Sequence, residues 1–389
     1  MRREAGYLLV ELLVSTGIML AVTATVFSLV NQAQGTFAVA PEVADMQQRL
    51  RVAEDTLYRN LVMAGGGAYS GTQAGPLTFF FAPVLPSRQG AVRDDAPGAC
   101  RTDTITLLYV PATAVQTTLV GGLHGHSGEI TVKAEPSCPQ GQMLCGFEEG
   151  STVLIYDETG NHDVATMTNV QDAGAHIQIN RPSGIAPYNE GAKIVQAESR
   201  TYFLNAATSQ LLFYDGSANG DVPVVDHVVG LTFDYYGDPQ PPFLKKPVSD
   251  PTGPWTTYGP RPPALGVQST AYPAGENCTF TIDAASGQQV SRLGVLGASG
   301  SSTLVNLMQA QLTDGPWCPD AMNPNRWDAD LLRIRKIAVT LRVESAVEAL
   351  RGPAGTLFVH SGTSRGGHRF APDQEVRFQV SPRNLNLGR

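Results

Sequence analysis

The stretch MRREAGYLLVELLVSTGIMLAVTATVFSLV (residues 1–30) decides how the rest of this chain must be arranged. From Tyr7 to Val30 every residue is apolar or small except Glu11. As a helix, this run would rise about 36 Å, which is enough to cross a bilayer core of about 30 Å. Arg2 and Arg3 precede the run, so the positive-inside rule predicts a cytoplasmic N-terminus. The rest of the chain then lies on the opposite side of the membrane.

Two other interpretations of this run are a cleaved secretory signal and an ordinary membrane anchor. A secretory signal has an apolar region of about 7–15 residues that ends at a small-x-small site. This run is longer, and Ala21-Val22-Thr23 and Ala24-Thr25-Val26 make poor cleavage sites. An ordinary anchor has no reason to keep Glu11, because an acid in hydrocarbon costs at least ~2.5 kcal/mol. The glutamate therefore indicates a functional role for the segment.

The residues around this glutamate resemble the cleavage and methylation segment of type IV prepilins and pseudopilins. The resemblance is carried by Gly6, by Tyr7-Leu8-Leu9-Val10, and by Glu11 followed by Leu12-Leu13-Val14. It implies a leader peptide over residues 1–6, cleavage after Gly6 by a prepilin peptidase, and N-methylation of Tyr7. Residues 7–30 are then the transmembrane helix. Tyr7 stands where phenylalanine is commonest in the family, and Leu8-Leu9 replaces the more usual Thr-Leu pair.

The resemblance also implies a partner for Glu11 during assembly. Cleavage after Gly6 creates a free amine on Tyr7, and a carboxylate in lipid is tolerable when it is paired with a cation. We expect Glu11 to pair with the amine of a neighbouring subunit and so to set the register of a filament. The alternative is that Glu11 reaches the membrane interface, since it lies only four residues from the mature end.

Residues 31–64 are expected to continue the helix, with a break near 35–41 where Gly35 and Pro41 interrupt the pattern. An apolar stripe at spacings of three and four follows the break, formed by Val43, Met46, Leu50, Ala53, Leu57 and Leu61. The other face is polar, with Gln47, Gln48, Arg51, Glu54 and Asp55. Gly65-Gly66-Gly67 ends the helix. The stripe packs either on the chain's own sheet or on a partner helix, and the first interpretation is favoured.

Residues 65–389 predict a β-rich head, so the fold class is α+β, with a long N-terminal helix packed on a largely antiparallel sheet. Short runs of β-formers separated by turn signals predict the strands. They are Thr104–Val110, Thr152–Tyr156, Val164–Val170, His176–Asn180, Arg200–Leu204, Leu211–Tyr214, Val224–Tyr236, Ile334–Val343 and Val376–Val380. Residues 239–303, rich in Pro, Gly and Ser, are expected to form an irregular insertion with one short helix over Ser302–Leu312.

The head adds a looser resemblance to large PilW-type minor pilins and to the J-type minor pseudopilins of type II secretion. It is carried by ADMQQRLRVAEDTLYRNLVMAG (44–65), RTYFLNAATSQLLFYDG (200–216) and VSPRNLNL (380–387). The resemblance implies a minor subunit rather than a major pilin, because major pilins are commonly less than half this length. The insertion over residues 239–303 aligns with neither group.

The five cysteines of the chain show no CxxC spacing of a zinc or thioredoxin-like site. An oxidising compartment makes disulfides of Cys138, Cys145, Cys278 and Cys318 plausible, with their connectivity open, and leaves Cys100 over. In a reducing cytosol all five would stay unpaired. The membrane topology favours the first interpretation.

Other motifs give little support for catalysis or for a metal. No HExxH or phosphate-binding loop sequence is present, and nothing links a serine and a histidine into a nucleophile and base arrangement, so we expect no enzyme and assign no catalytic residue. His124-Gly125-His126 lacks further ligands at a suitable spacing. Oxygen donors around a glycine resemble a calcium loop, which some pseudopilins carry. They are Asp215, Ser217, Asn219, Asp221 and Asp226; a plain Asn-Gly hairpin turn is the favoured alternative.

The sequence therefore predicts a minor pilin or pseudopilin, a structural and assembly subunit of a type IV pilus or a type II secretion-like filament. Its expected partners are other pilin subunits, the prepilin peptidase and the inner membrane, with the head first periplasmic and later on the filament or cell surface. The net charge of −8 argues against nucleic acid as a partner for the whole chain. The alternative is a filament-tip binding module, an adhesin or DNA-uptake subunit, for which the insertion offers Lys245, Lys246, Trp255 and Tyr258. An anchored periplasmic enzyme is the third and least favoured hypothesis.

Overall fold

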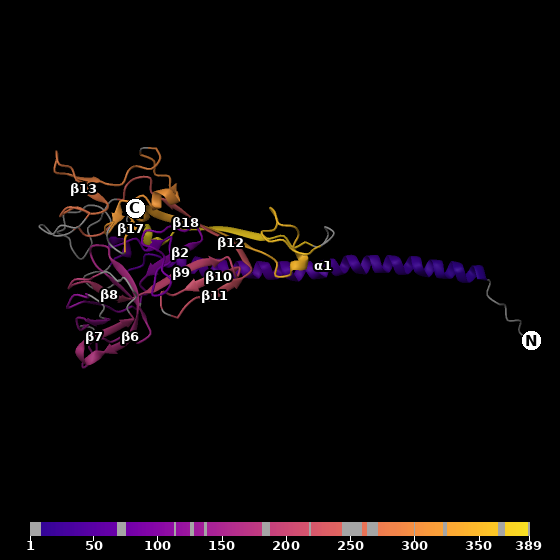
Figure 1. The fold of residues 1–389 in the computed structure, drawn as a ribbon, viewed down its shortest axis with the longest axis horizontal. Helices are drawn as coiled ribbons and strands as arrows, with labels where there is room; N and C mark the ends of the chain where they lie inside the picture. Colours follow the sequence, from indigo (N-terminus) through magenta and orange to yellow (C-terminus); the bar gives the residue numbers. More distant parts are fainter. Residues whose placement is uncertain are drawn as a thin grey trace, which may run out of the picture. The chain divides into compact units, whose positions relative to one another are not determined.

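The computed structural model (Figure 1) shows an α+β protein with one long helix, and the ranges that it describes have gaps. They are residues 9–67, 75–112, 114–124, 128–135, 138–180, 187–217, 219–242, 259–262, 271–298, 300–321, 325–364 and 370–387, with backbone alone over 31–38. The chain divides into two compact units. The first contains Met1–Arg51 and Arg342–Glu375, and the second contains Val52–Leu341 and Val376–Arg389.

Helix α1 runs from Leu9 to Met63 as one element of 55 residues. The predicted break near 35–41 is wrong, because the helix continues through Gly35 and contains Pro41. A proline inside a helix removes one hydrogen bond and displaces the carbonyl four residues earlier. Pro41 is exposed, so that carbonyl can reach solvent while the turns on both sides keep their bonds. Gly65, with φ of 78°, follows the helix in the left-handed conformation that a helix stop requires.

The apolar stripe of α1 is covered by the chain itself. Met46 is fully buried in the first unit, and Ala53, Leu57 and Leu61 are fully buried in the second. In the second unit the Asn60 side chain donates to the Tyr202 hydroxyl at 2.8 Å and accepts from the Tyr109 hydroxyl at 3.2 Å. Tyr109 and Tyr202 belong to neighbouring strands of a five-stranded sheet, which we call the main sheet of the head. The predicted internal packing of the stripe is therefore confirmed.

The head contains a five-stranded antiparallel sheet, a four-stranded sheet and an inserted six-stranded sheet. The five-stranded sheet has the order β1-β2-β9-β10-β11, with β1 Val84–Leu85, β2 Thr104–Tyr109, β9 Glu198–Asn205, β10 Gln210–Tyr214 and β11 Val222–Asp226. The four-stranded sheet has the order β15-β12-β18-β19, with β15 Val305–Leu307, β12 Val228–Gly237, β18 Ile334–Val343 and β19 Gln374–Val380. In β19 the predicted alternation is present, since Val376, Phe378 and Val380 are more buried than Arg377 and Gln379.

One predicted strand is two strands in the structure. The run Val224–Tyr236 is divided at His227, whose φ of 58° is left-handed and ends the extended backbone. Strand β11 before it belongs to the five-stranded sheet, and β12 after it belongs to the four-stranded sheet. Valine pairs lie on both sides of Asp226-His227, so this polar dipeptide gives only a weak local sign of the division.

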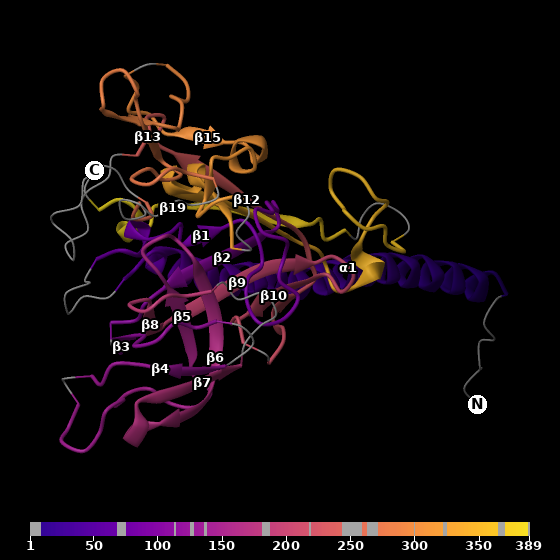
Figure 2. The ribbon, with the colours of Figure 1, turned by 60° about the vertical axis from the view of Figure 1, so that its left-hand side comes forward.

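A six-stranded module is inserted between β2 and β9. Its order is β3-β8-β5-β6-β7-β4, with β3 Gln116–Thr118, β8 Lys193–Gln196, β5 Thr152–Tyr156, β6 His162–Gln171, β7 His176–Asn180 and β4 Glu129–Thr131. The first and last strands also meet, because Leu119 bridges to Val132 and Val120 N–H donates to Thr131 O at 2.9 Å. The sheet therefore closes into a small barrel, seen in Figure 2 around the labels β3 to β8. Its interior is filled by apolar side chains such as Ile155, Met167 and Ile177.

The predicted insertion 239–303 is not wholly irregular. Its described part contains an antiparallel hairpin, β13 Phe280–Ile282 paired with β14 Gln289–Ser291, and most of its proline-rich half lies outside the described residues. The expected helix over Ser302–Leu312 is instead β15 followed by a short 3-10 turn, η3 Gln309–Leu312. The remaining short elements are β16 Trp317–Cys318, β17 Trp327–Asp328, η1 Leu77–Phe79, η2 Asp172–Gly174, η4 Ala329–Arg333, η5 Glu348–Leu350 and η6 Arg383–Leu385.

Candidate functional site

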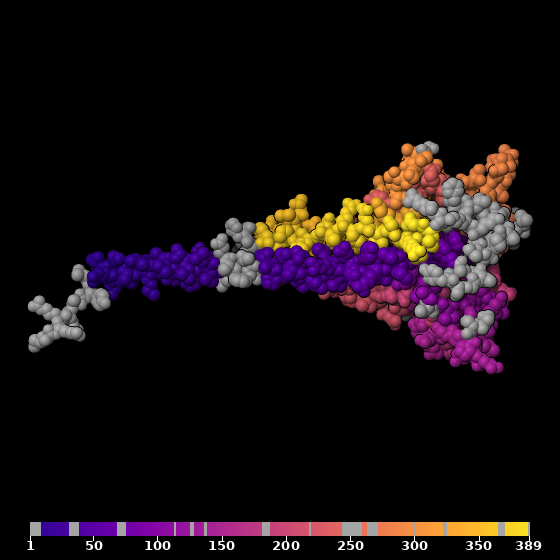
Figure 3. Space-filling view, turned by 180° about the vertical axis from the view of Figure 1, so that it is seen from behind, coloured from indigo at the N-terminus to yellow at the C-terminus, as the bar shows by residue number. Residues whose placement is uncertain are grey.

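The N-terminal part of α1 presents an apolar surface that nothing in its own unit covers. Every side chain from Leu9 to Val30 is exposed, and Figure 3 shows this part of the helix bare on the face it draws. Within the described residues, Leu9–Val30 is the segment long and apolar enough to cross a membrane. A soluble protein rarely exposes an apolar surface of this size without a partner.

The few polar side chains of this segment are satisfied within the helix. Thr16 donates to Leu12 O at 2.9 Å, Thr23 donates to Met19 O at 2.7 Å, and Thr25 donates to Val22 O at 2.7 Å. Such bonds keep hydroxyl groups compatible with hydrocarbon, where no water replaces a lost partner. The segment therefore meets the hydrogen-bonding requirement of a lipid environment as well as the length requirement.

Glu11 is the charged residue of this segment. It lies in the first turn of α1, where its carboxylate is favourably placed near the positive end of the helix dipole. Its side chain is exposed, so the structure presents it at the surface of an isolated chain. The predicted processing residues Gly6 and Tyr7 lie outside the described residues, and cleavage and methylation stay predictions.

The four cysteines that were disulfide candidates form two bonds. Cys138 pairs with Cys145 in the loop between β4 and β5 of the barrel, and Cys278 pairs with Cys318. Cys100 is left as a free thiol, as expected. Burial, together with the Asp328 carboxylate, raises the pKa of the Cys100 thiol to about 11. A thiol with such a pKa is protonated at neutral pH and is a poor nucleophile.

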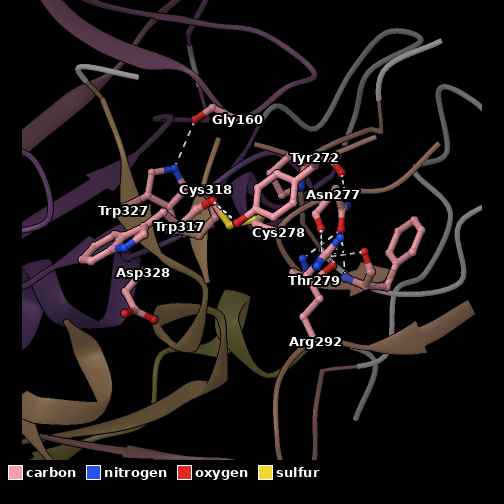
Figure 4. The surroundings of a disulfide bond; sticks show 12 residues. Gly160, Tyr272, Asn277, Cys278, Thr279, Arg292, Trp317, Cys318, Trp327 and Asp328 are labelled. Carbon is pink, nitrogen blue, oxygen red and sulfur yellow. Dashed lines mark hydrogen bonds between the residues drawn. A yellow bond between two sulfur atoms is a disulfide. The ribbon is translucent and has the colours of Figure 1, made fainter. Parts of the chain in front are cut away.

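The Cys278–Cys318 bond joins the insertion to the body of the head (Figure 4). Beside it, the Asn277 side chain accepts from the backbone N–H groups of Thr279 and Phe280, and its amide donates to Pro260 O. On the other side, Trp327 Nε1 donates to Gly160 O at 3.2 Å. The described end of the insertion is thus fixed covalently and by a dense hydrogen-bond network.

The predicted calcium residues are only partly brought together. Asp215 Oδ1 accepts from the N–H and hydroxyl of Ser217, whose hydroxyl in turn accepts from Asn219 N–H. Asp221 instead pairs with Arg88 at 2.8 Å, and Asp226 accepts from Gln210 Nε2 at 2.7 Å within the β10–β11 pair. The loop therefore joins two paired strands, as the hairpin alternative requires. Calcium binding here stays a prediction.

Arg88 supplies the cation that pairs with Asp221. The guanidinium of Arg88 lies 4.0 Å from the ring centroid of Tyr214 and 5.0 Å from that of Phe203. A buried cation stacked on aromatic rings needs a counter-ion, and Asp221 supplies it. The arrangement fits a structural ion pair.

A second group of carboxylates was not singled out from the sequence. One oxygen each of Asp314, Asp328 and Asp330 lie within 4.8 Å of one another, which is a donor set suited to a hard cation. The Asp328 oxygens accept from the N–H groups of Gly315 and Asp330 at 2.7 and 2.8 Å, and Asp330 pairs with Arg333. Burial raises the pKa of Asp328 to about 7. Backbone and arginine partners thus already engage the two buried carboxylates.

The histidine pair considered as a metal motif remains untested. His124 is exposed, and His126 lies outside the described residues. Lys245, Lys246, Trp255 and Tyr258, named for a tip-binding role, also lie outside them.

The inserted barrel is the largest feature that the sequence did not reveal as a unit. Strands β5, β6 and β7 were predicted, but β3, β4 and β8 were not, because they have only three or four residues and carry weak signals. Closure depends on pairing Leu119 with Val132 across a turn region, which no local pattern specifies. The direct pairing of β2 with β9, about ninety residues apart, marks the module as an insertion, and this pairing is visible only in the structure.

Comparison with protein families, with curated proteins and with solved structures found no match to this chain.

Proposed function

We propose that this protein is a minor pilin or pseudopilin, a structural subunit that is processed by a prepilin peptidase and enters a type IV pilus or a type II secretion-like filament. The observation that carries the proposal is the bare apolar segment Leu9–Val30 with Glu11 in its first turn. An apolar helix of this length needs lipid or other helices around it.

The continuity of α1 supports an assembly role. The same helix that is bare over Leu9–Val30 is buried along one stripe farther on, at Met46 and Leu57. Part of the helix is therefore covered by its own chain, while its N-terminal part is available to other subunits. In this proposal the helix is anchored in the inner membrane before assembly, with the head periplasmic, and lies among other helices in the filament afterwards.

The exposed Glu11 supports pairing between subunits. A carboxylate in an apolar surface costs free energy unless a cation accompanies it, and the N-terminal amine of a neighbouring processed chain is such a cation. The two intrachain disulfides fit the oxidising compartment that this topology requires. We expect no enzymatic activity.

Co-purification with filaments tests the assembly role. The Glu11→Val variant keeps the apolar helix but removes the charge, so it should insert in the membrane and yet be lost from sheared filaments. The Thr16→Val variant is the matched control, because the Thr16 hydroxyl donates to carbonyls of its own helix, and it should enter filaments like the wild type. Equal recovery of the Glu11→Val variant and the wild type would count against the proposed role of Glu11.

A filament-tip binding module is the second candidate, and the inserted barrel favours it. The barrel has its own closed core and interrupts a strand pair of the head, so it can vary without disturbing the main sheet. Replacing residues 114–197 by a short loop should leave assembly intact while abolishing adhesion or DNA uptake. Loss of assembly together with binding would instead make the barrel part of the assembly machinery.

A further inference from the structure

The turn between strands β5 and β6 of the barrel contacts two segments that lie far from it in the sequence. Trp327 Nε1 in the β16–β17 hairpin donates to Gly160 O at 3.2 Å. Pro260 of the insertion also lies against Gly160, so closely that a Cβ at Gly160 would be 2.7 Å from Pro260 Cγ. The turn is therefore held both by the hairpin and by the insertion.

Arg261 extends the contact of the insertion with the turn. Its backbone N–H donates to Glu158 O, and its guanidinium pairs with the Glu158 carboxylate. Glu158 also pairs with Lys193 Nζ at 3.4 Å. Lys193 is a buried residue of β8, and a buried ammonium requires a nearby carboxylate. The insertion thus joins a group of charges that reaches from the turn to the neighbouring strand β8.

The Cys278–Cys318 disulfide connects the two segments that hold the turn. Cys318 lies opposite Trp327 in the β16–β17 hairpin. Cys278 follows Asn277, whose side-chain amide donates to Pro260 O. Figure 4 shows the disulfide together with the Trp327 hydrogen bond and the Asn277 side chain. These contacts close a ring at the turn, and the disulfide is its covalent link. We call this ring the clamp; it consists of residues 259–262, 277–278, 317–318 and 327.

The clamp holds the barrel at a distance from the two connections that join the barrel to the main sheet. The chain enters the barrel at Val115 and leaves it at Ala197, and these points are adjacent because Gln196 N–H donates to Val115 O at 3.0 Å. Ala197 N–H donates to Thr152 O at 3.2 Å, at the start of β5. The turn begins at Asp157, about 16 Å farther along at about 3.3 Å per residue. A module attached at one place can pivot, and a second attachment at this distance removes that freedom.

The aromatic contacts at the same end of the barrel do not supply this restraint by themselves. Phe80 packs on Tyr156, and Phe81 stacks on His162. Apolar contacts are non-directional, so they permit small tilts that keep the rings buried. Hydrogen bonds and a disulfide require particular distances and angles. The clamp therefore provides the directional contacts that define one orientation of the barrel.

We propose that the clamp locks the barrel in one orientation on the main sheet and that the Cys278–Cys318 bond keeps the clamp closed. Without this bond, the hairpin and the insertion separate from the turn independently, and the barrel pivots about its two connections. The device fixes the direction in which the barrel surface is presented. The inference holds whatever the barrel binds and does not depend on the proposed pilin role.

Pulsed electron spin resonance distances between two spin labels test the proposal on the full chain in detergent. Gln171→Cys labels the exposed end of β6, and Val222→Cys labels the exposed edge strand of the main sheet, in a Cys100→Ser background. Gln171 lies five residues beyond Thr166, which is the partner of Thr152 beside the connections. A pivot of about 20° would therefore move Gln171 by about 5 Å.

Opening the disulfide should broaden the distribution of this distance. In the Cys278→Ser/Cys318→Ser variant we expect a broadening of about 5 Å, while the labelled parent gives one narrow distribution. The Cys138→Ser/Cys145→Ser variant is the matched control, because that bond lies within the barrel, and it should stay narrow. A disulfide that merely stabilises the head would lower the denaturant midpoint without broadening the native distance. An unchanged distribution in the Cys278→Ser/Cys318→Ser variant overturns the proposal.

Two single variants test the clamp with the disulfide intact. Arg261→Ala removes the ion pair with Glu158, and Trp327→Phe removes the N–H that reaches the turn. Each should broaden the same distribution, to a smaller extent than the double-serine variant. A label pair within the barrel, Val120→Cys with Gln171→Cys, should stay narrow and so show that the barrel is folded. If the double-serine variant fails this check, narrow distributions in both single variants overturn the proposal.

Discussion

The imidazole of His162 stacks on the ring of Phe81 with 4.4 Å between the centroids, and so joins strand β6 of the barrel to the segment after η1. Burial lowers the pKa of His162 to about 4. Tyr156 of β5 lies on the same side, 5.0 Å from the Phe80 ring. Through these aromatic contacts the inserted barrel packs against the segment that follows η1.

Acid should weaken the packing of His162 and so lower the free energy of unfolding. The pKa of His162 is about 4 in the folded chain against 6.5 in the unfolded chain, so its contribution is complete above pH 6.5 and is lost as the pH falls toward 4. From pH 7 to pH 5 the loss is about 2 kcal/mol in the free energy of unfolding. A His162→Gln variant should lose this pH dependence in urea titrations. His176→Gln, at a partly exposed histidine, should keep it.

Asp328 should produce the opposite dependence. Its pKa is about 7 in the folded chain against 3.8 in the unfolded chain, so the folded state is favoured at low pH and loses stability as the pH rises from about 4 to 7. Between pH 5 and pH 8 the loss is about 2–3 kcal/mol. Asp328→Asn should flatten this part of the stability profile, whereas Asp283→Asn, at an exposed carboxylate, should not. An unchanged slope in Asp328→Asn would mean that another group titrates.

The two disulfides should differ in their effect on stability. In the chain-entropy account, opening Cys278–Cys318, which spans 40 residues, costs about 4 kcal/mol, and opening Cys138–Cys145, which spans seven, costs about 2–3 kcal/mol. Denaturant midpoints of the two double-serine variants measure the difference. Cys100→Ser is the control, because Cys100 is free and should leave the midpoint nearly unchanged. The reverse ranking would show that the insertion is held mainly by its hydrogen bonds.

The buried stripe of α1 should matter for folding rather than for assembly. Leu57→Ala removes a fully buried side chain and should cost about 2–5 kcal/mol in thermal or urea unfolding. Val52→Ala, on the exposed side of the same helix, should cost less than about 1 kcal/mol. If the two variants unfolded alike, the stripe would not be part of the core.

Local patterns predicted the parts of this fold in which one short segment determines its own structure. The strands Thr152–Tyr156, His176–Asn180 and Ile334–Val343 were predicted with the bounds that the structure shows. The stripe of α1 was predicted because its spacing of three and four reports directly on burial. The disulfide candidates were identified by cysteine spacing and compartment, and the structure supplied their pairing.

The remaining features depend on contacts between distant segments. The barrel closes because Leu119 meets Val132 and because β3 pairs with β8, more than seventy residues away. Asp314 lies near Asp328 because the next residue, Gly315, donates its N–H to the Asp328 carboxylate. A linear sequence pattern does not show this bond. Helix α1 continues through Pro41 because the proline faces solvent. Whether one helical position is exposed depends on the packing around it, which local sequence does not specify.

Mass spectrometry of the mature N-terminus tests the central claim most directly. The chain should be expressed in a host with a prepilin peptidase and recovered from its membranes, with Gly6→Leu as an uncleaved control. The account predicts a chain that begins at N-methylated Tyr7 and retains the whole apolar segment. A chain that begins at Met1, or one cut at residue 20 or later, would contradict the pilin assignment.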